Sequence, residues 1–313
     1  MKKVPVPFSR PVTQAKHTLA VDAALVATIL IWAVNFSAVK FALEFLEPFA
    51  FNSIRLIGAS IIFLALARLV PAPAVLPEDR LRFLVLALVG HTGYQLLFIS
   101  GIDETTASNS AILLGLTPVF VAILSSLFSI ERASSRTWIG ISVSVLGVYL
   151  VLHNSARLGG SARGDWLTLA AAMCWSAYTV AAQPVVARYG PFKTNAYAMV
   201  LGTLVFLPFG TPALLALDPA TVPAAAWWAT VYSFVFALVV AYCFWFFAVS
   251  RIGPTQTAIY SNLMPVAALA IAHLWIGEAI GALQVIGATT IFLGIYLVRK
   301  RHQRSLDPDK RSR

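Results

Sequence analysis

Long apolar stretches recur along the chain from residue 22 to residue 298. A run of about 18 or more apolar residues with few charges is long enough to cross the hydrocarbon core of a bilayer as a helix. Glycines, prolines and charged residues separate the runs, and several separations are so short that neighbouring helices must be antiparallel. The pattern predicts an all-α integral membrane protein with ten transmembrane helices, at residues 22–43, 48–69, 82–102, 106–128, 136–153, 165–187, 194–215, 225–249, 255–276 and 281–298.

Composition narrows the class further. The chain has 313 residues, of which 59% are hydrophobic and 12% charged, whereas a soluble domain carries about 25% charged residues. Cys174 and Cys243 both lie in apolar runs and form neither a disulfide framework nor a metal-ligand motif. The sequence has no phosphate-binding loop, no zinc-protease motif and no nucleophile elbow. We therefore expect a protein that is not an enzyme and not an ATP-driven pump, with no catalytic residue, metal or cofactor.

The net charge of +10 raises the question of nucleic-acid binding, which the placement of the basic residues answers. With the N-terminus in the cytoplasm, 19 of the 23 Lys and Arg residues fall on the cytoplasmic side and 2, Arg157 and Arg163, on the other. Lys40 and Arg55 lie inside helices. Because basic residues are enriched in cytoplasmic loops, this asymmetry predicts that both termini are cytoplasmic. Nucleic acid is not needed to explain the charge.

The two halves of the chain resemble each other. A shift of 143 residues aligns Asp22 with Asp165 and Trp32 with Trp175, and a shift of 147 aligns Pro118 with Pro265. Because each half holds five helices, the second enters the membrane from the opposite side, which is the inverted repeat of many secondary transporters. The predicted organisation is a cytoplasmic tail at 1–21, a first repeat at 22–153, a periplasmic linker at 154–164, a second repeat at 165–298 and a basic cytoplasmic tail at 299–313.

The motifs in these repeats carry a family resemblance. They comprise Trp32 and Asn35 in the first helix, Thr106-Ala107-Ser108 and Pro118 around the fourth, and Glu131-Arg132 with Gly140 and Gly147 around the fifth. In these features the chain resembles the ten-helix EamA-type branch of the drug/metabolite transporter superfamily, and within it the bacterial amino-acid exporters of the YddG kind. The resemblance covers residues 20–300 and implies a basket-like bundle in the bacterial inner membrane that moves small metabolites, often outward.

Polar and aromatic residues deep inside the spans are the candidates for a transport cavity, because such groups rarely face lipid. Four helices, the first, third, sixth and eighth, carry them on one face. Core packing is the alternative for the Trp residues and snorkelling for Lys40. Arg55 can pair with Glu44, Glu47 or a substrate carboxylate, and a structural role is its alternative. Hydrogen-bonded packing is the alternative for His91, and a bond to a neighbouring helix for Asn35 and Asn262. The predicted substrate-binding residues are Trp32, Asn35, Lys40, Arg55, His91, Tyr94, Gln95, Trp175, Tyr178, Tyr242, Trp245 and Asn262.

Two prolines are the candidate hinges. Pro118 and Pro265 lie near the middle of the fourth and ninth spans at equivalent positions of the two repeats. A proline inside a helix removes a backbone hydrogen bond and kinks the helix. Equivalent kinks suggest gating hinges, and static bends that shape the bundle are the alternative.

The 13 acidic residues all lie at span ends, in loops or in tails. A proton relay through a midplane carboxylate is therefore disfavoured. A cavity with cationic and aromatic groups suits a substrate with a carboxylate and an apolar side chain. We expect an exporter of amino acids, preferring aromatic or apolar ones, whose partners are this substrate and the lipid bilayer, as a monomer or weak homo-oligomer. The alternatives are an exporter of other metabolites or drugs and, in another class, a membrane scaffold or receptor.

Overall fold

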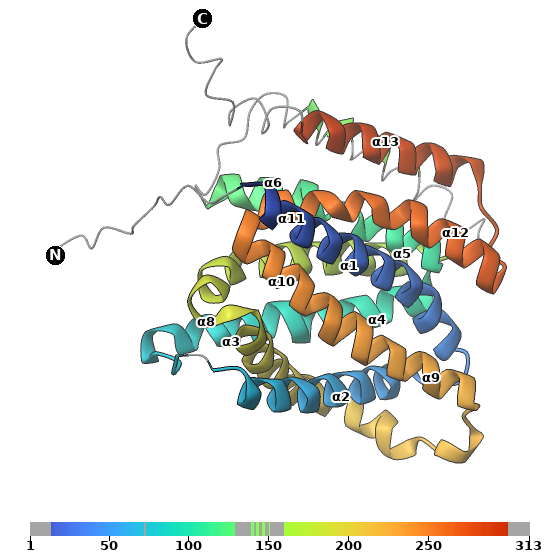
Figure 1. Cartoon of the computed structure of the whole chain (residues 1–313). Helices are drawn as coiled ribbons and strands as arrows, with labels where there is room; N and C mark the ends of the chain where they lie inside the picture. The colour runs from blue at the N-terminus through green and yellow to red at the C-terminus, as the bar shows by residue number, and fades with distance from the viewer. Residues whose placement is uncertain are drawn as a thin grey trace, which may run out of the picture.

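The computed structural model describes residues 14–71, 73–128 and 160–299, together with positions 139, 140, 142, 143, 146, 147 and 150. All regular structure in this part of the chain is helical. The helices pack into one bundle, with α2 (Pro48–Leu69) along one edge and α13 (Ala282–Arg299) along the opposite edge (Figure 1). The expected span at 136–153 lies largely outside the described residues. The remaining expected spans are helical, which confirms the all-α prediction.

Six helical stretches in the described part are long and apolar enough to cross a bilayer, and two more apolar helices are shorter. Two things separate this result from the ten expected spans: the span at 136–153 lies largely outside the described residues, and two other spans are joined. The spans expected at 165–187 and 194–215 lie in one continuous segment, α8 (Ala162–Ala216), which bends at Gly190 (φ 76°). A positive φ is readily adopted only by glycine, so Gly190 is where the segment can turn.

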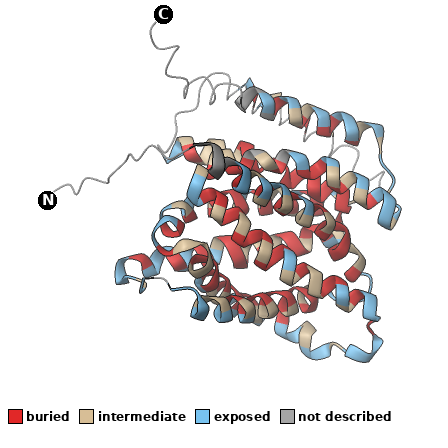
Figure 2. Ribbon diagram, viewed as in Figure 1, coloured by how far each residue is buried: buried red, intermediate tan, exposed pale blue. Residues whose placement is uncertain are grey.

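Side-chain burial follows the pattern of a membrane protein. Large apolar side chains such as Ile61, Leu204 and Leu274 are 60% or more exposed on the outside of the bundle. Polar side chains, mostly Ser, Thr and Asn, are buried inside it, and the buried residues gather in the interior (Figure 2). This distribution fits helices whose outer faces meet lipid while their polar groups bond to one another.

Helix starts follow local capping rules. Glu47 accepts a hydrogen bond from the Ala50 amide at the start of α2, and Ser161 accepts one from the Gly164 amide at the start of α8. At the start of α5 (Ala107–Leu114), Thr106 accepts from the Asn109 amide. Such caps satisfy amide groups that have no partner in the first helical turn.

Two of the long helices contain a wide π-helical turn. The third expected span consists of η1 (Pro77–Asp79), α3 (Arg80–Ala87), the π segment η2 (Leu88–Gly93) and α4 (Tyr94–Glu104). The short helix η4 (Pro219–Thr221) precedes the eighth expected span. That span consists of α9 (Ala224–Tyr232), the π segment η5 (Ser233–Val240) and α10 (Ala241–Ile252). A π turn is rare and often marks a functional site.

Two other helices are broken near their middle. The fourth span is α5 followed by α6 (Thr117–Leu127), and the ninth is α11 (Pro254–Ile259), η6 (Tyr260–Leu263) and α12 (Met264–Ile276). Pro118 and Pro265 lie in the first turns of α6 and α12. A proline is well tolerated there because the first helical amides need no intrahelical partner. The two candidate hinges therefore each follow a short, tight right-handed turn that interrupts the α-helical hydrogen bonding.

Candidate functional site

A cavity of about 480 Å³ lies inside the bundle. Its wall includes residues of α1 (Gln14–Ala42), α2, α4, α8, η5 and α10, and of both broken helices. Apolar side chains in its wall belong to two buried clusters, so the cavity lies at their junction. It is lined by Trp32, Asn35, Phe36, Arg55, Tyr94, Gln95, Phe98, Leu114, Thr117, Trp175, Ala237, Leu238, Tyr242, Ser261 and Met264.

Seven of the predicted substrate-binding residues lie in this wall, and they come from five helical segments far apart in the sequence. These seven are Trp32, Asn35, Arg55, Tyr94, Gln95, Trp175 and Tyr242.

Aromatic rings form one side of the cavity. The ring centroids of Trp32 and Trp175 are 5.3 Å apart at nearly perpendicular planes, and that of Tyr242 lies 4.9 Å from Trp175. Trp175 also contacts Tyr94 at 5.4 Å between centroids. Edge-to-face and tilted pairs at such distances are favourable and hold the rings in fixed orientations. The cavity thus has a rigid aromatic wall.

Arg55 supplies the positive charge of the cavity. Its side chain is 1% exposed, and its Nη1 donates a hydrogen bond to Asn52 Oδ1 at 2.8 Å. The guanidinium lies 5.3 Å from the ring centroid of Phe51 and 6.0 Å from that of Phe98. Its Nε has no hydrogen-bond partner among the described residues.

No carboxylate neutralises this charge in the described part of the chain, whose ion pairs do not include Arg55. Glu47, one of the partners considered from the sequence, caps α2 instead. A buried cation without an anionic partner is costly. The arrangement leaves Arg55 able to bind an anionic group that enters the cavity.

Hydrogen bonds fix α1 to the π segment η5 beside the cavity. Trp32 Nε1 donates to the Ala237 carbonyl at 3.0 Å, and Ser233 Oγ donates to Asn35 Oδ1 at 2.5 Å. Tyr232 Oη adds a bond to the Ile31 carbonyl at 3.0 Å. Two predicted residues, Trp32 and Asn35, are therefore oriented by the irregular turn of another helix.

The two helix breaks meet at the cavity. Leu114 and Thr117 flank the first break and Ser261 and Met264 the second, and all four line the wall. Gly115 packs so tightly against Pro265 that a Cβ atom at Gly115 would lie 2.7 Å from the proline Cγ. Discontinuous helices around a binding site are a recurring device in secondary transporters.

Four of the predicted residues lie outside the cavity wall. His91 Nε2 bonds to Tyr178 Oη at 3.1 Å, and Tyr178 in turn donates to Asn195 Oδ1, which places both behind the aromatic wall. Trp245 Nε1 donates to Thr179 Oγ1, and Lys40 Nζ donates to the carbonyls of Ile102 and Asp103 at the end of α4. A cation there complements the helix C-terminus. The side chain of the remaining predicted residue, Asn262, lies outside the described residues.

The sequence analysis missed the cavity residues at the helix breaks. Thr117 and Met264 each immediately precede one of the two equivalent prolines. A signal was therefore present, since a proline in the middle of an apolar span marks a place where the helix can be interrupted.

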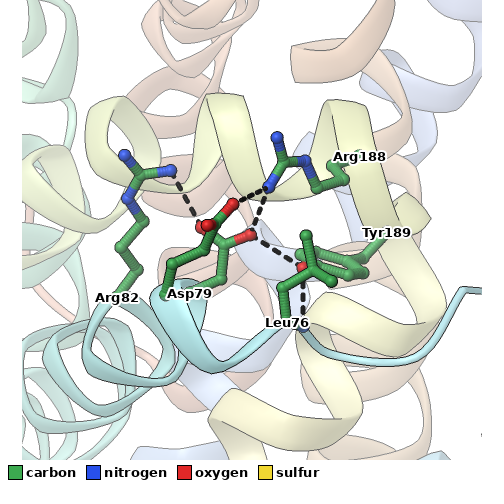
Figure 3. Close-up of polar contacts among 6 residues, drawn as sticks. Leu76, Asp79, Arg82, Arg188 and Tyr189 are labelled. Atoms are coloured by element: carbon green, nitrogen blue, oxygen red, sulfur yellow. Dashed lines mark hydrogen bonds and ion pairs between the residues drawn. The ribbon is translucent and has the colours of Figure 1, made fainter.

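A polar cluster joins two segments that are far apart in the sequence (Figure 3). Asp79 accepts hydrogen bonds from Arg82 Nη1 at 2.9 Å, from Arg188 Nη1 at 2.7 Å and from Tyr189 Oη at 2.7 Å. Tyr189 Oη also accepts one from the Leu76 amide at 3.1 Å. The cluster holds the loop that precedes α3 against α8, at the residues just before the bend of α8 at Gly190.

Glu278 makes a comparable contact elsewhere in the bundle. Its carboxylate accepts bonds from the Ala107 amide at 2.7 Å, the Ser108 amide at 3.0 Å and Ser108 Oγ at 2.6 Å. The loop between α12 and α13 therefore caps the first turn of α5 from outside that helix.

Comparisons with known proteins agree with this architecture. A protein of Streptantibioticus cattleyicolor named "probable terminal-alkyne amino-acid exporter" is 32% identical over 89% of this chain and 93% of its own. An uncharacterized transporter of Archaeoglobus fulgidus is 29% identical over 89% of this chain and 97% of its own. A solved crystal structure aligns with a TM-score of 0.61 at 18% identity, over 90% of this chain and 99% of the other, which indicates a shared fold. The sequence model of the EamA-like transporter family matches twice, at residues 19–153 and 162–300. The chain is therefore a transporter that belongs to the EamA-like transporter family.

Proposed function

We propose that this protein is a secondary transporter of the bacterial inner membrane that exports amino acids, with aromatic or apolar side chains preferred. The observation that carries the proposal is a buried cation, Arg55, which has no carboxylate partner among the described residues and shares its cavity with an aromatic wall. A guanidinium binds a carboxylate through charge-assisted hydrogen bonds. The rings of Trp32, Trp175 and Tyr242 provide an apolar surface for the side chain.

The composition of the cavity wall supports a small substrate. Aromatic and apolar side chains form most of the wall and a few polar groups complete it, which is usual for small-molecule sites. The name of the Streptantibioticus relative adds support, because it refers to export of an amino acid.

The proposed topology is ten transmembrane helices in two inverted repeats, at 22–153 and 165–298, with both tails cytoplasmic. Recurrent irregularities support the repeat. A shift of 147 residues carries the π turn at 88–93 onto 235–240, inside η5, and the break at 115–116 onto 262–263, inside η6. Inverted repeats provide two related conformations that open to opposite sides around one midplane site.

Alternating access then requires contacts that can break at the two ends of the bundle. The polar cluster around Asp79 and the Glu278 cap are suited to this, because each joins elements of the two proposed repeats. In this topology the Asp79 cluster faces the cytoplasm and Glu278 the periplasm.

The test is transport into liposomes that contain the purified protein. Counterflow of labelled amino acids, with and without a pH gradient, should show movement of phenylalanine, tryptophan or leucine and little of lysine or glutamate. No counterflow of any amino acid, together with transport of a cationic dye, would identify a drug exporter instead. No transport of either class would favour the scaffold or receptor alternative. Strict dependence on the pH gradient would refute only the inference that no buried midplane carboxylate couples transport to protons.

A further inference from the structure

We infer that the cavity recognises its substrate as an apolar carboxylate, so that carboxylates without a free α-ammonium group, such as arylalkanoic acids and N-acylated amino acids, also bind. The inference deepens the proposed function and rests on the same cavity. It concerns whether the protein recognises the carboxylate or the α-ammonium group of an amino acid.

Charges around the cavity are unbalanced. Arg55 is the one charged residue in the described wall, and no acidic residue lines it. Acidic side chains elsewhere have other partners: Asp79 bonds to Arg82, Arg188 and Tyr189, and Glu278 bonds to the start of α5. A carboxylate that enters the cavity therefore meets an opposite charge, whereas an ammonium group does not.

Hydrogen-bonding groups show the same imbalance. Donor capacity is available at Arg55 Nε and Gln95 Nε2, which have no partner among the described residues. The acceptors nearest the wall are largely used, since Asn35 Oδ1 accepts from Ser233 and the Ala237 carbonyl accepts from Trp32. Among the described wall residues, the side-chain acceptors without a partner are Gln95 Oε1 and the hydroxyl oxygen of Tyr242, and neither carries a negative charge.

An α-ammonium group carries a full charge and three donors. In this cavity it would meet the uncharged acceptors Gln95 Oε1 and Tyr242 Oη and the aromatic faces of Trp32 and Trp175. Cation–π contact compensates part of its lost hydration, while the like charge of Arg55 opposes it. Replacing the ammonium by hydrogen or by an uncharged acylamide removes this desolvation cost. Removing the carboxylate instead leaves Arg55 unpaired and places a second cation beside it.

The experiment compares four ligands as competitors of labelled L-phenylalanine counterflow by the wild-type protein in liposomes. They are unlabelled L-phenylalanine, 3-phenylpropionate, N-acetyl-L-phenylalanine and 2-phenylethylamine. We expect 3-phenylpropionate and N-acetyl-L-phenylalanine to compete within about threefold of L-phenylalanine or better, and 2-phenylethylamine to be at least about tenfold weaker, the equivalent of one charge-assisted hydrogen bond. The inference is overturned if 2-phenylethylamine competes as strongly as L-phenylalanine. It is also overturned if 3-phenylpropionate and N-acetyl-L-phenylalanine are at least about tenfold weaker competitors than L-phenylalanine.

Binding to the purified protein separates this inference from the proposed function. Quenching of tryptophan fluorescence reports ligand near Trp32 and Trp175 whether or not transport occurs. Binding of 3-phenylpropionate without phenylalanine transport would refute the proposed amino-acid exporter and support the inference. Phenylalanine transport without 3-phenylpropionate binding would support the proposed amino-acid exporter and refute the inference. No binding of either ligand would refute both the proposed function and the inference.

A matched pair of variants locates the effect. Arg55→Gln should remove the preference for acid over amine, because the buried positive charge is lost. Arg251→Gln removes a cation that lies over Phe247 outside the cavity wall and should leave the preference unchanged. If Arg55→Gln keeps the preference for acid over amine ligands, the inference that Arg55 recognises the carboxylate is overturned.

Discussion

Replacement of Arg55 by glutamine separates a binding role for this residue from a structural one. The variant removes the positive charge and keeps a polar side chain that can still bond to Asn52 Oδ1, the acceptor of Arg55 Nη1. Because Arg55 is buried, solvent and salt do little to screen its interaction with a bound carboxylate. The full strength of a charge-assisted hydrogen bond should therefore be lost.

The expected effect on affinity follows from that bond. Hydrogen bonds to charged groups contribute about 1.5–3 kcal/mol, which corresponds to about a 10- to 150-fold change in a dissociation constant. The concentration of L-phenylalanine that gives half-maximal counterflow should rise by this factor. Arg55→Lys should lie between wild type and Arg55→Gln, since it keeps the charge and loses the planar, two-pronged geometry.

Thermal stability distinguishes the two roles. The helix bundle buries the charge of Arg55 without an ion-pair partner among the described residues. Removing an uncompensated buried charge does not by itself destabilise a fold, although contacts with the Phe51 and Phe98 rings are lost. We expect the unfolding temperature of purified Arg55→Gln to stay close to that of wild type. A large fall in unfolding temperature with unchanged half-saturation in the folded fraction would refute the reasoning.

Further predictions concern the aromatic wall, helix packing, a cap and topology. Trp175→Ala should raise the half-saturation concentration for L-phenylalanine by at least about 2- to 12-fold, because one aromatic contact with the substrate contributes about 0.5–1.5 kcal/mol beyond area burial. Gly202→Ala should lower the unfolding temperature, because its Cβ would lie 2.4 Å from the His91 Cβ and overpacking costs about 1–3 kcal/mol. Glu278→Ala should also destabilise the protein, by about 0.5–2 kcal/mol, since α5 loses its capping carboxylate. Reporter fusions at either terminus should be active only with a cytoplasmic reporter.

Each of these predictions has a control and a contrary result. Trp166, Leu204 and Glu44 are exposed residues whose alanine variants should match wild type. Unchanged kinetics in a folded Trp175→Ala protein would assign that ring to packing alone. Wild-type unfolding temperatures for Gly202→Ala or Glu278→Ala would contradict the respective contacts. A periplasmic reporter active at one terminus would show an odd number of spans.

Much of the helical framework and seven of the 15 cavity-lining residues could be predicted from sequence. Apolar length identifies helices because a bilayer sets a minimum length, and a polar residue deep in a span indicates an interior-facing position. This reasoning located Arg55, Gln95 and the two equivalent tryptophans, Trp32 and Trp175. All four lie in the cavity wall.

What sequence reasoning could not supply depends on the neighbour that each residue meets. Lys40 shares a helix face with Trp32, yet it reaches the carbonyl groups at the end of α4. His91 lies behind the wall because a wide π turn in its own helix and the Tyr178 hydroxyl fix its position. Position along a span also failed to predict exposure of acidic residues, since Asp79 and Asp165 lie at span ends and are nevertheless buried.

The breaks in the fourth and ninth helices show a further limit. The two prolines predicted kinks, whereas the α-helical hydrogen bonding stops in a short, tight right-handed turn and restarts at Thr117 and Met264. Apolar pattern alone cannot distinguish a bend from a break, because both keep the span hydrophobic. The distinction depends on local contacts, such as the bond from Thr117 Oγ1 to the Leu114 carbonyl at 2.7 Å, which satisfies an acceptor at the helix end.

The central claim is that one cavity binds the substrate through Arg55 and the aromatic wall. An experimental structure of the purified protein with bound L-phenylalanine tests it most directly. We predict the carboxylate within hydrogen-bond distance of the Arg55 guanidinium and the phenyl ring among Trp32, Trp175 and Tyr242. Phenylalanine bound elsewhere in the bundle, or bound in the cavity with its carboxylate directed away from Arg55, would contradict the claim.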